Sequence, residues 1–365
     1  MYINSVNIEG FRNYDLQRVE LDPGINVFYG NNAQGKTNFL EAVYLCAMGK
    51  SFKFSKEKNL INFGENFARI SVDYVTGGIE KTNSVLIKPE SKQIKVNETV
   101  IKKRLDLIGR LNVILFTPQE LSIIKDGPAV RRKFIDFCAG QLRKKYLFAL
   151  SQYNKVLAQK SKLLKEGTNS SLYVWNEQLA EYGSTIMWYR ASLINKIKEM
   201  IEPIYNEITE KNEKLGIAYI KSIDFKDDFD QFRIKQHYMY HIQNICDREK
   251  QEQTCLIGPH RDDIMFYING KNAREFASQG QQRSIVLSLK LVEAELFKEQ
   301  TGEYPVMLLD DIASELDIER RKFLFSKIKD KQVIITCTDG DKLNIEGKAS
   351  YFYVENGKIT CGNGS

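Results

Sequence analysis

The sequence predicts an α/β protein with a mostly parallel sheet, an antiparallel β region and an inserted α-helical lobe. Three observations lead to this fold class. Short apolar stretches alternate with helix-like stretches toward both ends of the chain, as in parallel sheets covered by helices. Residues 68–100 alternate apolar and polar side chains with a period of two. The middle of the chain carries long runs with apolar residues three and four apart, the spacing of helices.

Composition bounds the class of protein. With 365 residues, 42% of them apolar, the chain can form two domains or one domain with a large insertion. Its six cysteines include no C-x-x-C pair and are read as reduced thiols, not as a disulfide frame or a zinc site. The first ten residues lack the pattern of a signal peptide, and no apolar run approaches the roughly 18 residues of a membrane span. We therefore expect a soluble, cytoplasmic protein with no membrane partner.

The N-terminal elements follow in order. Residues 2–8 alternate as a short strand, and I-N-V-F-Y at 25–29 predicts a second strand. A helix is predicted from residue 37, where T-N-F-L-E-A-V-Y-L-C-A-M has an apolar face. Three further strand-like stretches between 68 and 97 are separated by T-G-G and P-E-S-K, which predicts antiparallel hairpins.

Two long helices are predicted in the middle. The apolar positions of the first helix are Leu142, Tyr146, Ala149, Tyr153, Val156 and Leu163. Those of the second are Trp175, Leu179, Tyr182, Ile186, Leu193, Ile197 and Ile201. A short breaker segment between them favours antiparallel pairing, either as a stubby coiled coil or as core helices of a helical lobe. We assign residues 1–120 and 285–365 to one lobe and 121–284 to the helical lobe.

A phosphate-binding loop is predicted at residues 30–37. The stretch G-N-N-A-Q-G-K-T has the spacing G-x4-G-K-[ST] between a predicted strand and a predicted helix. Glycines let the backbone N–H groups point at a β-phosphate, the lysine reaches the β- and γ-oxygens, and the threonine ligates Mg²⁺. The predicted nucleotide contacts are Gly30, Asn31, Asn32, Ala33, Gln34, Gly35, Lys36, Thr37 and Asn38.

The second half of the metal site is predicted at the end of a buried strand. In Y-P-V-M-L-L-D-D, Asp310 is placed to hold Mg²⁺ through water, together with Thr37. Asp311 is placed to polarise an attacking water, so Asp311 and Lys36 are predicted catalytic residues. A last buried strand, Q-V-I-I-T-C-T-D, follows at 332–339.

The stretch A-S-Q-G-Q-Q-R-S at 277–284 opens another helix, and a helix mouth of this kind attracts anions. It resembles the signature motif of ABC-type ATPases, in which the helix tip contacts the γ-phosphate of ATP held by another subunit. The resemblance implies this role for Ser278, Gly280 and Gln281. S-E-L-D at 314–317 stands where that family carries the D-loop, which implies that Ser314 and Asp317 lie at a dimer seam.

Several stretches narrow the resemblance. I-E-G-F-R-N-Y and the phosphate-binding loop are similar to the SMC branch of the ABC ATPases, and no long coiled coil interrupts the chain. Within that branch the chain resembles the RecF family of bacterial recombination mediators along nearly its whole length. The stretches that carry this likeness include G-K-S-F, F-T-P-Q-E-L, P-A-V-R-R-K-F-I-D, W-N-E-Q-L-A-E-Y-G, G-P-H-R-D-D, F-A-S-Q-G-Q-Q-R-S and L-L-D-D-I-A-S-E-L-D.

This resemblance implies an ABC-ATPase head with ATP and Mg²⁺ as cofactors. It also implies an ATP-dependent homodimer that clamps DNA at single-strand/double-strand junctions. The partners implied are RecR and RecO, which help to place RecA during replication, recombinational repair and the SOS response. Arg12 and Asn13 are implied to lie by the nucleotide. Gln119 is the candidate glutamine that links Mg²⁺ to the helical lobe, and the resemblance implies it as a predicted catalytic residue beside Asp311 and Lys36.

Two departures from the family pattern predict slow hydrolysis, with ATP acting mainly as a dimer switch. Asp311 stands where many ABC ATPases have Glu, and Thr338 and Asp339 stand where the switch histidine is usual. A transporter's nucleotide-binding subunit and a self-sufficient P-loop enzyme such as a kinase remain alternatives. A transporter subunit would carry a fuller signature motif and a switch histidine. A self-sufficient P-loop enzyme would leave the stretch at 277–284 without a role.

Four basic clusters are candidate contacts to DNA phosphates, in keeping with the net charge of +6. They are Lys53, Lys56 and Lys58; Lys102, Lys103 and Arg104; Arg131, Arg132 and Lys133; and Arg143, Lys144 and Lys145. In the third cluster, Arg131 and Arg132 are also candidates for bracing the fold. His237 and His241 have a metal-binding spacing but no evident third ligand, so we expect ordinary surface or core histidines.

Overall fold

The structure, a computed structural model, describes residues 1–53, 56–167, 171–210, 213–226, 228–312, 316–340, 343, 345 and 347–362. The chain forms two compact units: unit 1 is Met1–Glu120 with Lys290–Ser365, and unit 2 is Leu121–Leu289. It therefore returns to unit 1 at Lys290, whereas the sequence-based boundary lies at 285. No helix within the described ranges combines the length and apolarity needed to cross a membrane.

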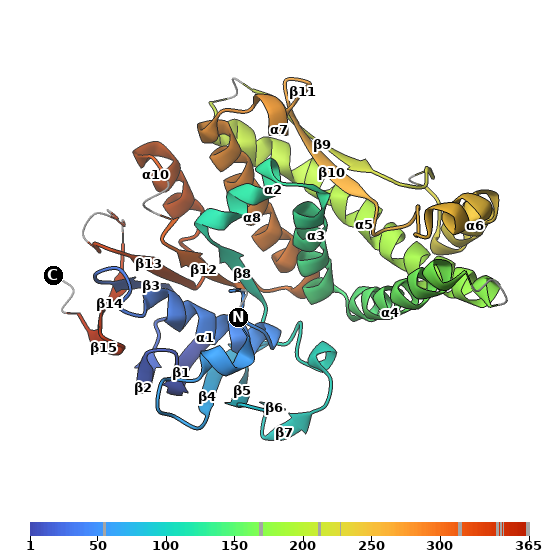
Figure 1. Ribbon diagram of the computed structural model, residues 1–365. Helices are drawn as coiled ribbons and strands as arrows, with labels where there is room; N and C mark the ends of the chain where they lie inside the picture. The colour runs from blue at the N-terminus through green and yellow to red at the C-terminus, as the bar shows by residue number, and fades with distance from the viewer. Residues whose placement is uncertain are drawn as a thin grey trace. The chain divides into compact units, whose positions relative to one another are not determined.

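The centre of unit 1 is a six-stranded sheet in the order β15-β14-β3-β13-β12-β8 (Figure 1). All neighbouring strands run parallel except the edge pair of β14 and β15. Helix α1 packs on this sheet through Phe39, whose ring stacks 4.3 Å from that of Phe28 on β3. The strands are β3 (Ile25–Tyr29), β8 (Val113–Phe116), β12 (Val306–Asp310), β13 (Val333–Cys337), β14 (Ala349–Glu355) and β15 (Lys358–Cys361). The helices are α1 (Lys36–Met48), α8 (Gln279–Thr301), which starts in unit 2, and α10 (Ile318–Lys327).

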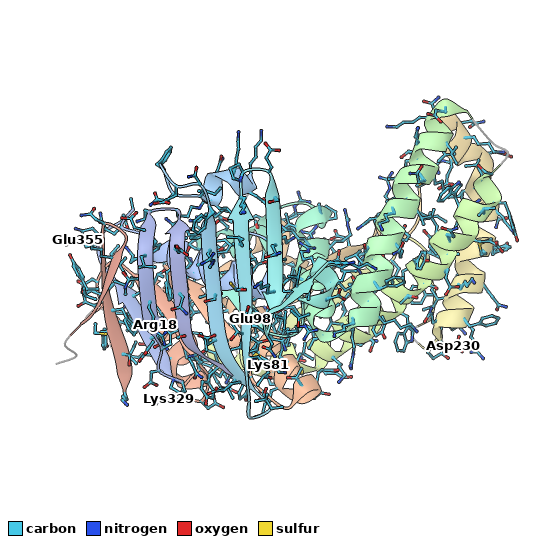
Figure 2. The ribbon with its side chains drawn as sticks, turned by 90° about the horizontal axis from the view of Figure 1, so that it is seen from below. Arg18, Lys81, Glu98, Asp230, Lys329 and Glu355 are labelled. Atoms are coloured by element: carbon cyan, nitrogen blue, oxygen red, sulfur yellow. The ribbon has the colours of Figure 1, made fainter. Side chains whose placement is uncertain are left out.

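A second sheet of unit 1 is wholly antiparallel, in the order β2-β1-β4-β5-β6-β7. Figure 2 looks onto its strands, with Arg18 on the β2 edge and Glu98 in the turn between β6 and β7. The predicted antiparallel region is confirmed, and the predicted strand at 2–8 joins this sheet. The strands are β1 (Tyr2–Phe11), β2 (Tyr14–Glu20), β4 (Ala68–Thr76), β5 (Ile79–Lys88), β6 (Ser91–Val96) and β7 (Thr99–Ile101). Short 3-10 turns are η1 (Glu57–Leu60), η2 (Arg104–Asp106) and η3 (Pro118–Leu121).

Unit 2 is mainly helical, and its two longest helices form the predicted antiparallel hairpin. Tyr146 near the start of α4 contacts Tyr189 of α5, while Leu164 near the end of α4 packs with Leu172 at the start of α5. A third helix, α6, packs against α5, so these are core helices of a lobe and not an isolated two-helix coiled coil. The helices are α2 (Ser122–Lys125), α3 (Pro128–Leu142), α4 (Lys144–Glu166), α5 (Leu172–Ile208), α6 (Gln231–Glu252) and α7 (Ala273–Phe276). A small antiparallel sheet completes the unit, with β9 (Leu215–Ile220), β10 (Asp263–Ile268) and β11 (Lys271–Asn272).

Two arginines, one buried and one half-buried, brace unit 2. Arg131 is 2% exposed and forms two hydrogen bonds to the Asp263 carboxylate, at 2.7 and 2.9 Å. Arg132 donates to the main-chain oxygen of Asp262 at 2.7 Å. A buried charge is tolerated only when it is paired and hydrogen-bonded, so the Asp263 pair fixes Arg131, while half-buried Arg132 is engaged by the Asp262 carbonyl oxygen. Their candidacy for DNA contact is therefore withdrawn.

The histidines of unit 2 have structural surroundings. His260 Nδ1 lies 2.7 Å from the Tyr153 hydroxyl and Nε2 lies 3.2 Å from the Cys255 carbonyl oxygen. Burial lowers the pKa of His260 to about 4. His237 and His241 face each other with 3.2 Å between their Nε2 atoms. The described residues contain no group of three or more candidate metal ligands, so this pair carries no metal assignment.

The buried imidazole predicts acid sensitivity. The folded-state pKa of His260 is about 4, below the roughly 6.5 of an unfolded histidine, so the contribution of the neutral ring is complete above about pH 6.5. That contribution is lost progressively as pH falls from there toward 4. We expect the urea midpoint of the wild-type chain to fall over this range more steeply than that of His260→Gln. Equal slopes in the wild-type chain and His260→Gln would contradict the assignment.

Candidate functional site

The loop between β3 and α1 has the backbone of a phosphate cradle. Gly30 and Gly35 have φ of 143° and 123°, and Ala33 has φ of 65°, so the chain curls in a conformation that side chains disfavour. A Cβ on Gly30 would lie 2.3 Å from the Val354 carbonyl oxygen, and one on Gly35 would lie 2.8 Å from Asn13 Nδ2. Glycine is therefore required at both positions by space as well as by φ.

Lys36 begins α1 and turns back over this loop. Its ammonium donates to the carbonyl oxygens of Gly30 at 2.6 Å and Asn31 at 2.7 Å, and the residue is 8% exposed. Burial lowers the pKa of Lys36, while the nearby carboxylates of Asp311 and Asp310 oppose that shift. Among the described residues no side chain caps the start of α1, so its first N–H groups face the cradle as helix termini do in anion sites.

The predicted metal ligands come together. Thr37 Oγ1 donates to Asp310 Oδ1 at 2.8 Å. Strands β3, β13 and β12 are consecutive and parallel, so their carboxyl ends meet at one edge of the sheet and bring this threonine and aspartate side by side. A hydroxyl and a carboxylate oxygen at such a distance suit Mg²⁺, which prefers hard oxygen ligands and keeps several waters.

Thr336 completes this edge, and sequence reasoning missed it. It lies on β13, the strand between the other two, and its hydroxyl also donates to Asp310 Oδ1 at 2.8 Å. The Asp311 N–H in turn donates to Thr336 Oγ1 at 3.0 Å, while Asp311 adopts a left-handed φ of 52°. One buried threonine therefore orients both acidic residues. The only sequence signal was a hydroxyl in the apolar run V-I-I-T-C.

Asn13 and Arg12 both lie beside the loop, in different roles. Asn13 Nδ2 donates to the Gln34 carbonyl oxygen at 2.8 Å, and Asn13 Oδ1 accepts from Asn38 Nδ2 at 2.9 Å. Arg12 instead forks onto the carboxylate of Glu41 on α1, at 3.0 and 2.8 Å. The structure thus places Asn13 against the loop and anchors Arg12 one helical turn beyond Thr37.

Glu41 is a buried carboxylate that the sequence motifs did not single out. Its side chain is fully buried, and besides Arg12 it accepts a hydrogen bond from the Ser51 hydroxyl and lies 3.5 Å from Lys53 Nζ. Lys53 also donates to Asn38 Oδ1 at 2.9 Å. Lys53 therefore supports the first turns of α1, and its candidacy for DNA contact is withdrawn.

The turn between β14 and β15 closes on the other side of the loop. The N–H of Asn356 donates to Gln34 Oε1 at 2.7 Å, and the N–H of Gly357 donates to the Gln34 carbonyl oxygen at 3.0 Å. Gly357 has φ of 72°, and a Cβ there would lie 1.9 Å from the Asn13 carbonyl oxygen. Residues more than 300 positions from the loop in the sequence thus fix the cradle, and no local motif predicts their role.

In unit 2, the predicted signature stretch forms the mouth of α8. Ser278 Oγ accepts from the Gln281 N–H at 3.2 Å, and Gln281 Oε1 accepts from the Ser278 N–H at 2.7 Å. This reciprocal pair is a capping box. Ser278 is exposed and Gly280 is partly exposed. Since an accepting hydroxyl keeps its own proton, Ser278 can still donate to an incoming anion.

The remaining predicted site residues that the structure describes lie on η3, at the start of α10 and just after β13. Gln119 is exposed on η3, and its neighbour Glu120 accepts from the buried Lys290 at 2.8 Å. Asp317 caps α10, accepting from the Arg320 N–H at 2.9 Å. Thr338 is exposed and Asp339 is partly exposed just after β13. Ser314 lies outside the described residues.

Comparison with known proteins identifies the family. Residues 2–360 match the family described as the RecF/RecN/SMC N terminal domain. This chain belongs to that family.

Curated members of the RecF/RecN/SMC family align over nearly the whole chain. The DNA replication and repair protein RecF of Clostridium tetani is 40% identical over 98% of this chain and 99% of its own length. The protein of that name in Clostridium botulinum Eklund 17B is 41% identical over 98% of this chain and 99% of its own.

Solved structures agree with the family assignment. A structure of the recombination mediator protein RecF with ATPrS is 36% identical, has a TM-score of 0.91 and covers 99% of this chain and 98% of that one. An Smc head bound to the C-winged helix domain of ScpA is 14% identical with a TM-score of 0.62 and shares the fold. The predicted ABC-ATPase head with its inserted helical lobe is confirmed.

The shared edge of β3, β13 and β12 predicts a metal-dependent site. Asp310→Asn keeps the size of the side chain but removes the charge, so we expect it to abolish the gain in nucleotide affinity that Mg²⁺ provides. The measurement is titration with a fluorescent ATP analogue in Mg²⁺ and in EDTA. Thr336→Val is the matched control: it removes one donor, keeps the carboxylate and should retain most of that gain. A Mg²⁺ effect of wild-type size in Asp310→Asn would contradict the site.

Proposed function

We propose that this chain is a RecF-type, ATP-dependent DNA-binding protein of replication and recombinational repair, acting in the cytoplasm. ATP is the proposed cofactor, with Mg²⁺ held by Thr37 and Asp310. The hydrogen bond between these two side chains is the observation that carries the proposal, because it joins the phosphate loop and the acidic strand in one site. Near-full-length relatives named DNA replication and repair protein RecF, and a solved structure of RecF with ATP, support it.

The residues of the site have distinct proposed roles. The loop amides and Lys36 bind the β- and γ-phosphate oxygens, which carry most of the negative charge of the nucleotide. Asp311 orients a water for attack and accepts its proton, and Thr336 holds the backbone of Asp311 in place. Magnesium, when bound, neutralises charge on the phosphates. Asn13 and Gln34 preserve the curvature of the loop, and Gln119 is a proposed further residue of the magnesium site.

Dimerisation on ATP is the second part of the proposal. The capping-box serine and Gly280 at the mouth of α8 meet the γ-phosphate on a second copy of the chain, with Asp317 and Ser314 at the seam. Two-fold symmetry then gives two composite sites. A helix start with an exposed serine supports this, since it offers a hydroxyl and N–H groups to an anion. The lobes proposed for these tasks are residues 1–120 with 285–365 and residues 121–284.

The partners follow from the same family. We propose that the closed dimer holds DNA at single-strand/double-strand junctions and cooperates with RecR and RecO to place RecA. A transporter subunit is disfavoured because the chain lacks the switch histidine and the fuller signature. A self-sufficient P-loop enzyme is disfavoured by the near-full-length likeness to RecF proteins.

Association driven by ATP tests the composite site. We expect the wild-type chain to change from monomer to dimer with a non-hydrolysable ATP analogue, as measured by light scattering after size exclusion. Lys36→Ala should lose nucleotide binding and dimerisation together. Ser278→Ala should keep nucleotide binding and weaken dimerisation at least tenfold, since it removes the donor offered to the partner's nucleotide together with the cap on the Gln281 N–H. Gln279→Ala, at an exposed neighbouring position, is the matched control; a dimer unaffected by Ser278→Ala would sink the proposal.

Hydrolysis is expected to be slow. Asp311 is one methylene shorter than the glutamate common in ABC ATPases, and Thr338 and Asp339 offer no imidazole. Turnover in the presence of DNA should stay below the roughly 1 s⁻¹ at the low end of ordinary enzymes. Asp311→Asn should lower it further while leaving ATP-dependent dimerisation intact. The assay is phosphate release at saturating ATP, and a rate like that of transporter ATPases would refute the prediction.

A further inference from the structure

Two basic segments that lie almost 50 residues apart in the sequence converge in unit 1. One follows α1 and contains Lys56 and Lys58, and the other follows β7 and contains Lys102, Lys103 and Arg104. We infer that these five side chains, here called the basic surface, bind the phosphate backbone of duplex DNA. The inference rests on the proposed DNA-binding function and assigns it a place on the molecule.

Contacts through Gly49 and Lys92 bring the segments together. Lys92 on β6 donates to the Gly49 carbonyl oxygen at 3.1 Å and forms an ion pair with Glu57, which lies between Lys56 and Lys58. A Cβ on Gly49 would lie 2.8 Å from Arg104 Cγ, so the stem of Arg104 packs against the end of α1. The hairpin of β6 and β7 carries the second segment, as Figure 1 shows.

The charges of the basic surface are available. All five residues are exposed, and within the described ranges none of them forms an ion pair. The carboxylate of Glu57 is already matched by Lys92. The exposed acids nearest the second segment along the described chain are Asp106 on η2 and Glu98, which pairs with Lys95. Five exposed cations on two converging segments form an electrostatic footprint for a polyanion.

The other basic clusters suit DNA less well. Arg131 and Arg132 are engaged inside unit 2, and Lys53 is engaged with Glu41 and Asn38. Lys144 and Lys145 are exposed at the start of α4, but Lys145 donates to Gln231, whose neighbour Asp230 is an exposed carboxylate. The basic surface is thus the candidate with the greatest excess of positive charge.

The chemistry of the surface favours phosphates over bases. Its five members are lysines and an arginine, and a duplex offers them a higher density of phosphate charge than a single strand does. Lysine and arginine contacts to phosphates fix the position of a protein on DNA without reading sequence. Binding should therefore tolerate any sequence, prefer duplex and weaken steeply with salt.

The test is fluorescence anisotropy with a labelled 30-base-pair duplex, the full chain and a non-hydrolysable ATP analogue, over 50–200 mM salt. Lys102→Gln/Lys103→Gln/Arg104→Gln keeps a polar side chain at each position and removes three charges. We expect duplex affinity to fall at least about tenfold at low salt and the salt slope to drop by about 3, close to 0.9 for each lost phosphate contact. Lys56→Gln/Lys58→Gln should lower the slope by about 2.

Lys322→Gln/Lys348→Gln/Lys358→Gln is the matched control, because it removes three exposed charges elsewhere in unit 1. It should bind as wild type does. An equal loss in this control would show that net charge alone attracts the duplex and would overturn the inference. So would a larger loss in Lys144→Gln/Lys145→Gln, or an unchanged slope in the triple variant of the basic surface.

Two outcomes keep this inference distinct from the function on which it rests. A wild-type chain that binds no duplex with the ATP analogue would remove the DNA-binding proposal itself. A wild-type chain that binds duplex, next to a basic-surface variant that binds equally well, would remove only the location. ATP-dependent dimerisation should be the same in all these variants, since none of the substituted residues belongs to the nucleotide site. If the basic-surface variants lose more affinity for single-stranded DNA than for duplex DNA, the choice of duplex as the ligand is refuted.

Discussion

The parallel register of β3, β13 and β12 is the constraint on which the rest of the site depends. The carboxyl ends of these strands lie at the same edge of the sheet, so Asp310 at the end of β12 accepts hydrogen bonds of 2.8 Å from Thr336 on β13 and from Thr37 on α1, the helix that follows β3. A slip of one residue in any of these strands would turn its terminal side chain to the opposite face of the sheet. Placement of Asp310, a proposed metal ligand, and of Asp311 is thus a consequence of sheet pairing.

Around that edge the molecule fixes the phosphate loop from two sides. Asn13, which follows β1, and the turn after β14 both hold the main chain of Gln34, although they come from opposite ends of the sequence. Behind the loop, fully buried Glu41 forms ion pairs with Arg12 and Lys53 and accepts a hydrogen bond from Ser51. A buried carboxylate is costly unless it is well paired, so these partners make the surroundings of α1 rigid as well as stable. Rigidity of this kind preorganises the cradle before any nucleotide arrives.

Charged side chains divide into those that build the fold and those that remain for a partner. In unit 2, Arg131 and Arg190 are buried and bound to the carboxylates of Asp263 and Asp136, so their charge never reaches solvent. In unit 1, the lysines beside η1 and η2 stay exposed. Runs of the same residue types therefore serve opposite purposes, and burial decides between them. A mildly basic sequence alone does not reveal where a polyanion binds.

The sequence by itself determined the features that are local. Spacing of glycine, lysine and threonine predicted the phosphate loop, period-two alternation predicted the antiparallel sheet, and helical spacing predicted the hairpin of α4 and α5. These signals survive in one dimension because turns, strands and helices repeat over a few residues. The tertiary structure alone decided that Thr336 orients both aspartates, that Glu41 holds Arg12, and that residues 356–357 clamp the loop. Such contacts join segments far apart in the chain, and long-range packing leaves no periodic trace in the residues that make it.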